Sequence, residues 1–287
     1  MLREAGRRAG AQGLRARGAR YAEQGEVVAA ARGGLSRLGS GTEASKPASV
    51  AVRRVQFADG LTEIGGISPD GRYLSFVDGG HGHGDLSVMD LATGQKQQVA
   101  KGASHKANVK VGAELSVFSP DGKQLAYGWH GPPDNDQLRI INVDGTGERT
   151  LFKKDHPMWI QTHGWAGGHV LIMYGRRDSK ETQILVVSAA DGSVQTLKTL
   201  QGDQPQVKLS PDGSWVAVAV SHPGSSLENT LSLISTADGR EVPLPKQAGL
   251  RQWVQGWTPD GKALLFTSTR DGRNNLYGLR VENGKAL

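Results

Sequence analysis

The sequence predicts an all-β fold of repeated four-stranded units, a β-propeller, preceded by a short tail. Three observations predict it: a Pro-Asp-Gly turn that recurs at regular spacing, a second glycine turn that follows each copy, and a glycine-rich composition. The 287 residues include 40 Gly but only 5 Phe and 5 Tyr. Abundant glycine with few large aromatic residues suits many short strands joined by tight turns.

The first turn occurs in four clear copies, whose prolines are 51, 91 and 48 residues apart. The doubled middle interval predicts a degenerate copy, and Trp165-Ala166-Gly167-Gly168 lies where it is expected. Proline presets a type I turn, and the following Asp and Gly suit its later positions. The four clear copies are Ser68-Pro69-Asp70-Gly71, Ser119-Pro120-Asp121-Gly122, Ser210-Pro211-Asp212-Gly213 and Thr258-Pro259-Asp260-Gly261.

A strand-like segment follows every copy, and a second turn comes after a further short strand. Trp215–Val220 and Val170–Tyr174 are two of these segments, and both are apolar almost throughout, as in strands buried on both faces. Each unit therefore resembles four strands, a to d, with the Pro-Asp-Gly turn between a and b. A period of 40–50 residues with four strands is typical of a propeller blade. A β-sandwich is the alternative, but it does not require a fixed order of two turn types.

The positive charge belongs to the tail. Residues 1–54 hold 11 Lys/Arg against 4 Asp/Glu, whereas the other 233 residues hold 23 against 24. The repeat region is therefore nearly neutral, and its charge does not favour nucleic-acid binding. No apolar run approaches the ~20 residues that a membrane-spanning helix needs.

The repeats resemble the TolB-like β-propeller repeat over residues 50–287. The resemblance implies six blades, whereas the sequence shows about five. Val52–Phe57 is an extra predicted strand before the first turn, and it suits the outer strand of a closing blade. We therefore expect an incomplete ring with exposed edges, with a closed five-bladed ring as the alternative.

Residues 1–49 are predicted to be a separate basic tail. A helix is possible over residues 19–38, and a Gly/Ser/Pro linker runs from Gly39 to Ser49. The segment Tyr21–Arg32 resembles the last helix of a tetratricopeptide array, as found ahead of TolB-like propellers. A disordered tail is the alternative, because one helix cannot bury its own apolar face.

No motif in the sequence predicts catalysis, so we expect a protein that is not an enzyme and needs no cofactor. The absence of cysteine excludes disulfides and thiol catalysis. The Gly-x-Ser-x-Gly nucleophile elbow of serine hydrolases is absent. The glycine-rich segment Gly79–Gly84 lies between strands rather than before a helix, so it does not predict a phosphate site. Most acids of the repeats lie in turns, where they are expected to bond the backbone.

Histidines gather on the face opposite the Pro-Asp-Gly turns, at the loops between strands b and c. We single out this loop face as the candidate ligand- or partner-binding site. Trp129, Trp159 and Trp253 lie near it or on inner strands. The alternatives are scattered exposed loop residues without a shared role, or a metal or pH-sensitive site at His81 and His83. The candidate residues are His81, His83, Asp85, His130 and His222.

The leading functional prediction is a non-catalytic scaffold that binds a protein or peptide, because propellers present a broad face built from loops. The resemblance implies a bacterial protein of the periplasm or cell envelope, although the chain shows no signal peptide. Two alternatives remain. One is the propeller module of a prolyl-oligopeptidase-type or other hydrolase, and the other is a metal- or small-ligand-binding propeller.

Overall fold

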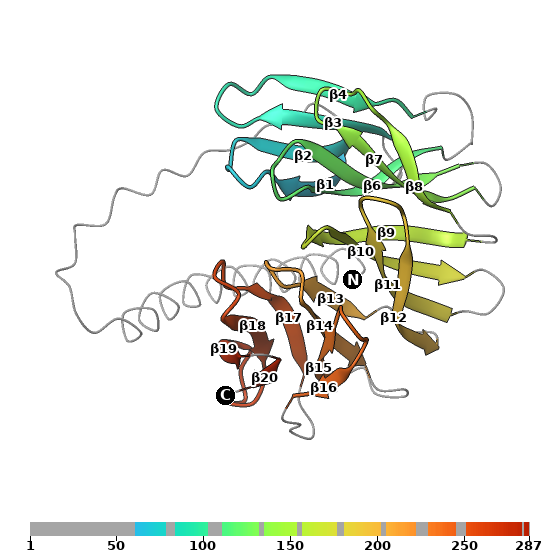
Figure 1. The fold of residues 1–287 in the computed structure, drawn as a ribbon. Coiled ribbons are helices and arrows are strands. Elements are labelled where there is room, and N and C mark those ends of the chain that lie inside the picture. The colour runs from blue at the N-terminus through green and yellow to red at the C-terminus, as the bar shows by residue number, and fades with distance from the viewer. Residues whose placement is uncertain are drawn as a thin grey trace, which may run out of the picture. The chain divides into compact units, whose positions relative to one another are not determined.

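The computed structural model describes residues 61–78, 84–102, 111–131, 135–153, 157–176, 181–201, 205–221, 229–244, 251–282 and 284–286. Within these ranges, every regular element is a β-strand (Figure 1). The predicted tail, its helix and the predicted strand Val52–Phe57 lie outside the described residues, so all three remain predictions.

Five antiparallel sheets of four strands follow one another along the chain, as predicted, and each keeps the strand order of the sequence. The first strands of consecutive blades, β1, β5, β9, β13 and β17, contact one another in series and are the inner strands. The strands are β1 (Leu61–Ile67), β2 (Tyr73–Asp78), β3 (Asp85–Asp90), β4 (Lys96–Ala100), β5 (Gly112–Phe118), β6 (Gln124–His130), β7 (Gln137–Asn142), β8 (Arg149–Lys153), β9 (Pro157–Ala166), β10 (His169–Arg176), β11 (Glu181–Ser188), β12 (Val194–Gln201), β13 (Gln206–Leu209), β14 (Trp215–Ser221), β15 (Asn229–Ser235), β16 (Glu241–Pro243), β17 (Gln252–Trp257), β18 (Ala263–Ser268), β19 (Asn275–Glu282) and β20 (Lys285–Ala286).

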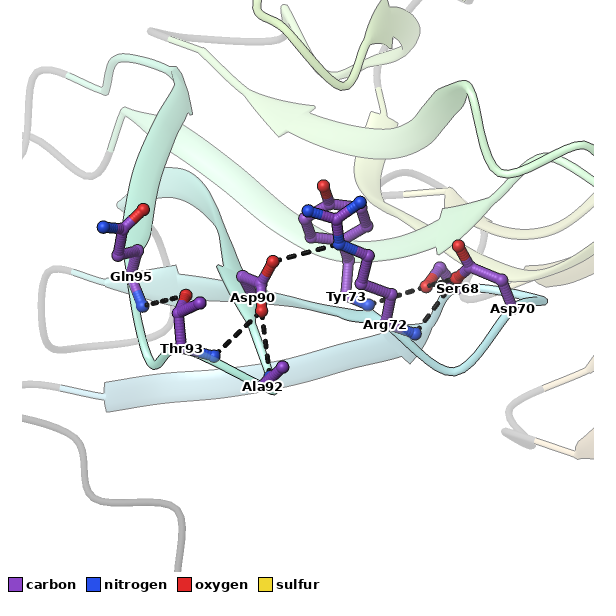
Figure 2. Close-up of polar contacts among 8 residues, drawn as sticks. All are labelled: Ser68, Asp70, Arg72, Tyr73, Asp90, Ala92, Thr93 and Gln95. Atoms are coloured by element: carbon purple, nitrogen blue, oxygen red, sulfur yellow. Dashed lines mark hydrogen bonds and ion pairs between the residues drawn. The ribbon is translucent and has the colours of Figure 1, made fainter.

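A network of side-chain hydrogen bonds within blade 1 holds its Pro-Asp-Gly turn (Figure 2). In blade 1, the Ser68 hydroxyl donates to Asp70 Oδ1 at 2.6 Å and accepts from the Tyr73 amide at 2.8 Å. Arg72 Nε then reaches Asp90 Oδ2 at 3.0 Å, which ties the a–b turn to the c–d turn. Asp90 also accepts from two amides of its own turn. These acids therefore hold the scaffold together, as the sequence predicts.

The same Ser/Thr–Asp bond recurs in blades 2, 4 and 5 at 2.5–2.6 Å. Blade 3 has the degenerate turn, in which Gly167 and Gly168 both have positive φ (56° and 78°). A Cβ on Gly167 would lie 2.8 Å from the Asp212 carbonyl oxygen of the blade 4 turn. The close approach of two turns explains why glycine replaces the Pro-Asp pair there.

Buried apolar side chains form four clusters, one between each pair of consecutive blades. Neighbouring residues of a second strand enter different clusters: Ile172 packs with blade 2, and Leu171 packs with blade 4. Both side chains are fully buried. This arrangement explains the continuous apolar runs of strands β10 and β14, because each blade is covered on both faces.

The two end blades differ from the inner three. Ile64 and Ile67 of β1 are 55% and 61% exposed, and Leu276 of β19 is 54% exposed. These apolar residues face away from the clusters that blades 1 and 5 share with their neighbours. The exposure of Leu276 argues against a closed five-bladed ring, in which blade 5 would pack against blade 1, whereas Leu74, Phe76 and Met89 on the same side of blade 1 as Ile64 are buried.

Candidate functional site

Three polar residues occupy the same level of three consecutive inner strands. Glu63 of β1 lies opposite Val77, Glu114 of β5 opposite Gly128, and Gln161 of β9 opposite Met173. All three lie in the first half of their strand. In each blade this half of strand a is on the same side of the molecule as the b–c loops. Together with His130 and Asp136, these residues are called the inner-strand polar cluster below.

Hydrogen bonds link the cluster from blade to blade. The Leu115 amide donates to Glu63 Oε2 at 3.1 Å, which joins blade 1 to blade 2. The Gln161 amide group donates to Glu114 Oε1 at 3.2 Å, which joins blade 2 to blade 3. The inner strands are thus tied by polar contacts at this level and by the apolar clusters further out.

Burial disfavours the ionised forms of Glu63 and Glu114. It raises the pKa of Glu63, although the hydrogen bond from the Leu115 amide opposes the rise. The pKa of Glu114 is raised to about 7, chiefly by burial, with smaller contributions from the negative charges of Glu63 and Asp136. The hydrogen bond from Gln161 and the proximity of His130 act in the opposite direction. Glu114 therefore changes its charge near neutral pH.

His130 is the last residue of β6 rather than a loop residue, a small correction to the sequence-based placement. Its Nδ1 lies 2.7 Å from Oδ1 of Asp136, which is only 3% exposed. The Gly131 amide donates to the same oxygen at 3.4 Å. Asp136 therefore orients the imidazole and fastens the chain that leaves β6.

Asp85, another predicted site residue, is held within blade 1. It begins β3, and its carboxylate accepts from the Gly102 amide at 2.7 Å and from Gln98 Nε2 at 2.5 Å. These bonds fasten the segment that follows β4. His81, His83 and His222 lie outside the described residues, so their grouping with Asp85 and His130 remains a prediction.

The structure thus groups His130 with Glu63, Glu114 and Asp136, which sequence reasoning did not single out. A signal was present, because Glu63 and Glu114 each lie five residues before the serine of a Pro-Asp-Gly turn. Gln161 and Asp136 have no such signal, because Gln161 precedes the degenerate turn of blade 3 and Asp136 lies between the second and third strands of blade 2.

The inner strands of blades 3, 4 and 5 also carry a buried histidine nitrogen, a lysine and a tryptophan. The pKa of His163 in β9 is lowered to about 4 by burial and by the charge of Lys208 in β13. Its Nε2 is buried without a hydrogen-bond partner. His163 is therefore neutral at physiological pH. Trp253 of β17 lies opposite Thr267, at the same level as Glu63, with the Arg251 guanidinium 6.0 Å from its ring. At the position of Glu63, the inner strands of blades 1 and 2 therefore carry an acid, and the inner strand of blade 5 carries an aromatic residue.

Within the ranges that the structure describes, no group of three or more His, Asp and Glu is placed to hold a metal ion. The same ranges contain no helix of the length and apolarity that crossing a bilayer requires.

Comparison with known proteins places this geometry among propellers. No family model matches the chain. The Tol-Pal system protein TolB of Francisella tularensis subsp. tularensis is 27% identical over 149 residues, which are 51% of this chain and 33% of that protein. The chain therefore matches about a third of the length of its curated relative.

Solved structures agree on the fold. A putative TolB from Agrobacterium tumefaciens has a TM-score of 0.57 at 19% identity, covering 82% of each chain. A prolyl endopeptidase has a TM-score of 0.58 at 15% identity, covering 79% of this chain and 35% of that one. With the five blades, these matches define the described part of the chain as a β-propeller. More particularly, its recurrent Pro-Asp-Gly turns and its similarity to the TolB proteins make it a TolB-like β-propeller.

Proposed function

We propose that the protein is a non-catalytic β-propeller that binds a protein or peptide partner over the inner-strand polar cluster. The observation that carries the proposal is the pair of half-buried carboxylates, Glu63 and Glu114, on neighbouring inner strands. Similarity to a relative named as a Tol-Pal system protein supports a role in protein assembly. The same similarity supports a place in the periplasm or cell envelope.

The chemistry of the cluster indicates which group of a partner it accepts. Among the described residues, the carboxylate of Glu114 lies near those of Glu63 and Asp136 and near the imidazole of His130. A Lys or Arg side chain entering from the loop face would offset their repulsion, and a guanidinium would also satisfy carboxylate oxygens in pairs. A basic segment of a partner is therefore the expected ligand.

Binding of labelled peptides tests this function. The probes are a fluorescein-labelled Gly/Ser peptide containing two Arg and the same peptide with Glu in place of Arg, both followed by anisotropy at pH 8. We expect the Arg peptide alone to bind, and the double variant Glu63→Gln/Glu114→Gln to weaken binding at least about tenfold, since each charge-assisted hydrogen bond contributes about 1.5–3 kcal/mol.

Glu241→Gln is the matched control, because Glu241 is an acid of outer strand β16 that pairs with Lys198 at 2.7 Å, away from the cluster. It should leave binding unchanged. In the wild-type protein, affinity should fall as the pH is lowered through about 7, where Glu114 takes up a proton. Equal affinity in the double variant, or binding of the Glu peptide, would refute the proposed site.

The second candidate function is the propeller module of a hydrolase. The match to a prolyl endopeptidase favours it, although only 35% of that chain is covered. The 287 residues contain no Gly-x-Ser-x-Gly motif. An α/β-hydrolase domain encoded in the same polypeptide would favour this candidate over the scaffold.

The metal- or small-ligand-binding alternative depends on His81, His83 and His222. Adding zinc, nickel or calcium while thermal unfolding is monitored examines it directly. A rise in the unfolding temperature that is lost in His81→Ala/His83→Ala would favour a metal site, because an ion that binds only the folded state stabilises it.

A further inference from the structure

A cavity of about 190 Å³ lies between blades 4 and 5, on the face that carries the Pro-Asp-Gly turns. Three turns enclose it: the Pro-Asp-Gly turn of blade 4, that of blade 5, and the turn between β19 and β20. It lies on the opposite face from the b–c loops, so the inner-strand polar cluster does not include it. The residues that line it include Ser210, Asp212, Ser214, Trp215, Trp257 and Gly284.

Two tryptophan rings line this cavity, one from each blade. Trp215 begins β14, where blade 1 has Tyr73 (Figure 2), and Trp257 ends β17. The Trp257 Nε1 donates to the Lys208 carbonyl at 3.2 Å, which fixes the indole. Among the clear copies of the turn, only blade 4 has tryptophan at the first position and only blade 5 at the second. The other residues are Tyr73, Gln124 and Ala263 at the first position, and Ile67, Phe118 and Leu209 at the second.

The Trp215 ring already attracts one cation of the chain. The guanidinium of Arg240 lies 5.9 Å from the ring centroid, within the range of a cation–π contact. Arg240 is not among the residues that line the cavity. The indole therefore has the surroundings in which a positive charge is favoured, and the cavity itself holds no basic side chain among the described residues that line it.

Asp212 gives the cavity a negative charge. Burial acts to raise the pKa of Asp212, but hydrogen bonds from Ser210 and Ser214 outweigh it, so the pKa is lowered. The carboxylate is therefore ionised at neutral pH. Since no lysine or arginine is among the described lining residues, the cavity combines one negative charge with two indole rings.

The polar groups of the cavity are already hydrogen-bonded to one another. The Ser210 hydroxyl donates to Asp212 Oδ1 at 2.5 Å and accepts from the Trp215 amide at 2.9 Å. The Ser214 amide donates to the same carboxylate oxygen at 3.0 Å. A sugar or a primary ammonium would have to compete with these bonds. A quaternary ammonium has no N–H to satisfy, so negative charge and aromatic surface suffice for it.

We propose that this cavity binds a quaternary ammonium group of the trimethylammonium type. Asp212 provides the opposite charge, and Trp215 and Trp257 provide the aromatic surface on which such cations are recognised. Free choline and the head group of a choline lipid share this chemistry, and the experiment below distinguishes the two sources. The proposal depends on blades 4 and 5 alone and is independent of the proposed peptide site.

Titration of the full chain with choline tests the site. The readout is the indole N–H signals of the tryptophans in proton–nitrogen NMR spectra, assigned with Trp215→Phe and Trp257→Phe, at constant ionic strength. We expect choline to shift the signals of Trp215 and Trp257 and to leave those of the other tryptophans in place. The neutral isostere 3,3-dimethyl-1-butanol should bind at least about tenfold more weakly, because it lacks the charge.

Asp212→Asn is the informative variant, because asparagine keeps an acceptor oxygen for the turn but removes the charge. It should weaken choline binding about tenfold or more. Asp121→Asn is the matched control. Asp121 has the same position in the turn of blade 2 and the same bond from Ser119 at 2.6 Å, but Gln124 stands there in place of a tryptophan. It should bind choline like the wild type, and circular dichroism confirms that both variants fold.

Sedimentation with phosphatidylcholine vesicles identifies the source of the cation. Vesicle binding that choline displaces would identify a lipid head group, whereas choline binding without vesicle binding would identify a free ion. Three results would overturn the proposal. These are equal binding of choline and its neutral isostere, choline binding that Asp212→Asn leaves unchanged, and tighter binding of methylammonium than of choline.

Discussion

Each aspartate of the Pro-Asp-Gly turns bonds its own turn. Asp212, for example, accepts from the Ser210 hydroxyl at 2.5 Å and from the Ser214 amide at 3.0 Å. Such bonds lower the pKa of Asp70, Asp121 and Asp260, because they favour the ionised form. The turns therefore contribute stability that is present above the usual pKa of aspartate and is lost as the pH falls through the lowered value.

The turn glycines provide a matched pair of substitutions. Gly71 and Gly213 both have a left-handed φ, +74° and +77°. A Cβ on Gly71 meets nothing within 4 Å, whereas a Cβ on Gly213 lies 2.8 Å from Ala166 in the neighbouring blade. We expect Gly71→Ala to cost about 1–2 kcal/mol from backbone strain alone, and Gly213→Ala at least ~1 kcal/mol more from the clash. Urea unfolding measures both, and equal costs would show that the turns of blades 3 and 4 do not pack closely.

At the scale of the strands, polar and apolar roles are divided by position in the blade. Strands β6, β10 and β14 carry the buried apolar residues of two clusters each, whereas the inner strands β1, β5 and β9 carry polar residues at one level. Two partly buried titratable groups of inner strands, Glu114 and His163, have pKa values shifted in opposite directions. They therefore give opposite dependences of stability on pH.

The direction of each pH dependence follows from the difference between the pKa values of the group in the folded and unfolded states. Because the pKa of Glu114 rises from 4.5 to about 7 on folding, folded-state stability should fall as the pH rises through that interval, by about 3 kcal/mol. Because the pKa of His163 falls from 6.5 to about 4, stability should fall as the pH drops through that interval. In the wild type, the two trends oppose each other.

Single substitutions separate the two trends. Glu114→Gln retains the hydrogen bond from Gln161 and should leave a protein whose stability rises between pH 4 and pH 6.5. His163→Phe fills the site without a titrating group and should leave a protein whose stability falls between pH 4.5 and pH 7. Chemical unfolding at a series of pH values measures both, and parallel pH profiles for the two variants would contradict the assignment.

At the scale of the whole molecule, charge and packing belong to different parts of the chain. Removing residues 2–49 removes nine Lys/Arg and four Asp/Glu, which leaves a net charge near +1 instead of +6. The four apolar clusters between the blades are built from residues 73–281. A propeller whose core does not include the tail should remain folded when the tail is removed.

We therefore expect the shortened protein to unfold at the same temperature as the full chain and to elute earlier from a cation exchanger. Differential scanning calorimetry and ion-exchange chromatography measure the two effects. A lower unfolding temperature would show that the tail packs against the propeller, contrary to the predicted domain organisation.

Much of the fold could be predicted from the sequence, because turn chemistry is local. Proline, aspartate and glycine act within four residues, so their spacing alone revealed five blades, including the degenerate copy at Gly167-Gly168. The site was less predictable. Loop position led to Asp85 and His130, but Asp85 is bonded within its own blade, and the cluster around His130 depends on Glu114 and Gln161 of separate blades.

The sequence by itself determined the repeat, the turn types, the four strands of each blade and the charge division between tail and propeller, because each arises from neighbouring residues. Only the tertiary structure decided which residues meet across blades. Glu63 reaches the backbone of blade 2, and Ile64 and Leu276 become exposed although their counterparts are buried, because packing of blade on blade joins positions about 50 residues apart. No local pattern distinguishes these positions from their counterparts in other blades, so their exposure became visible only in the fold.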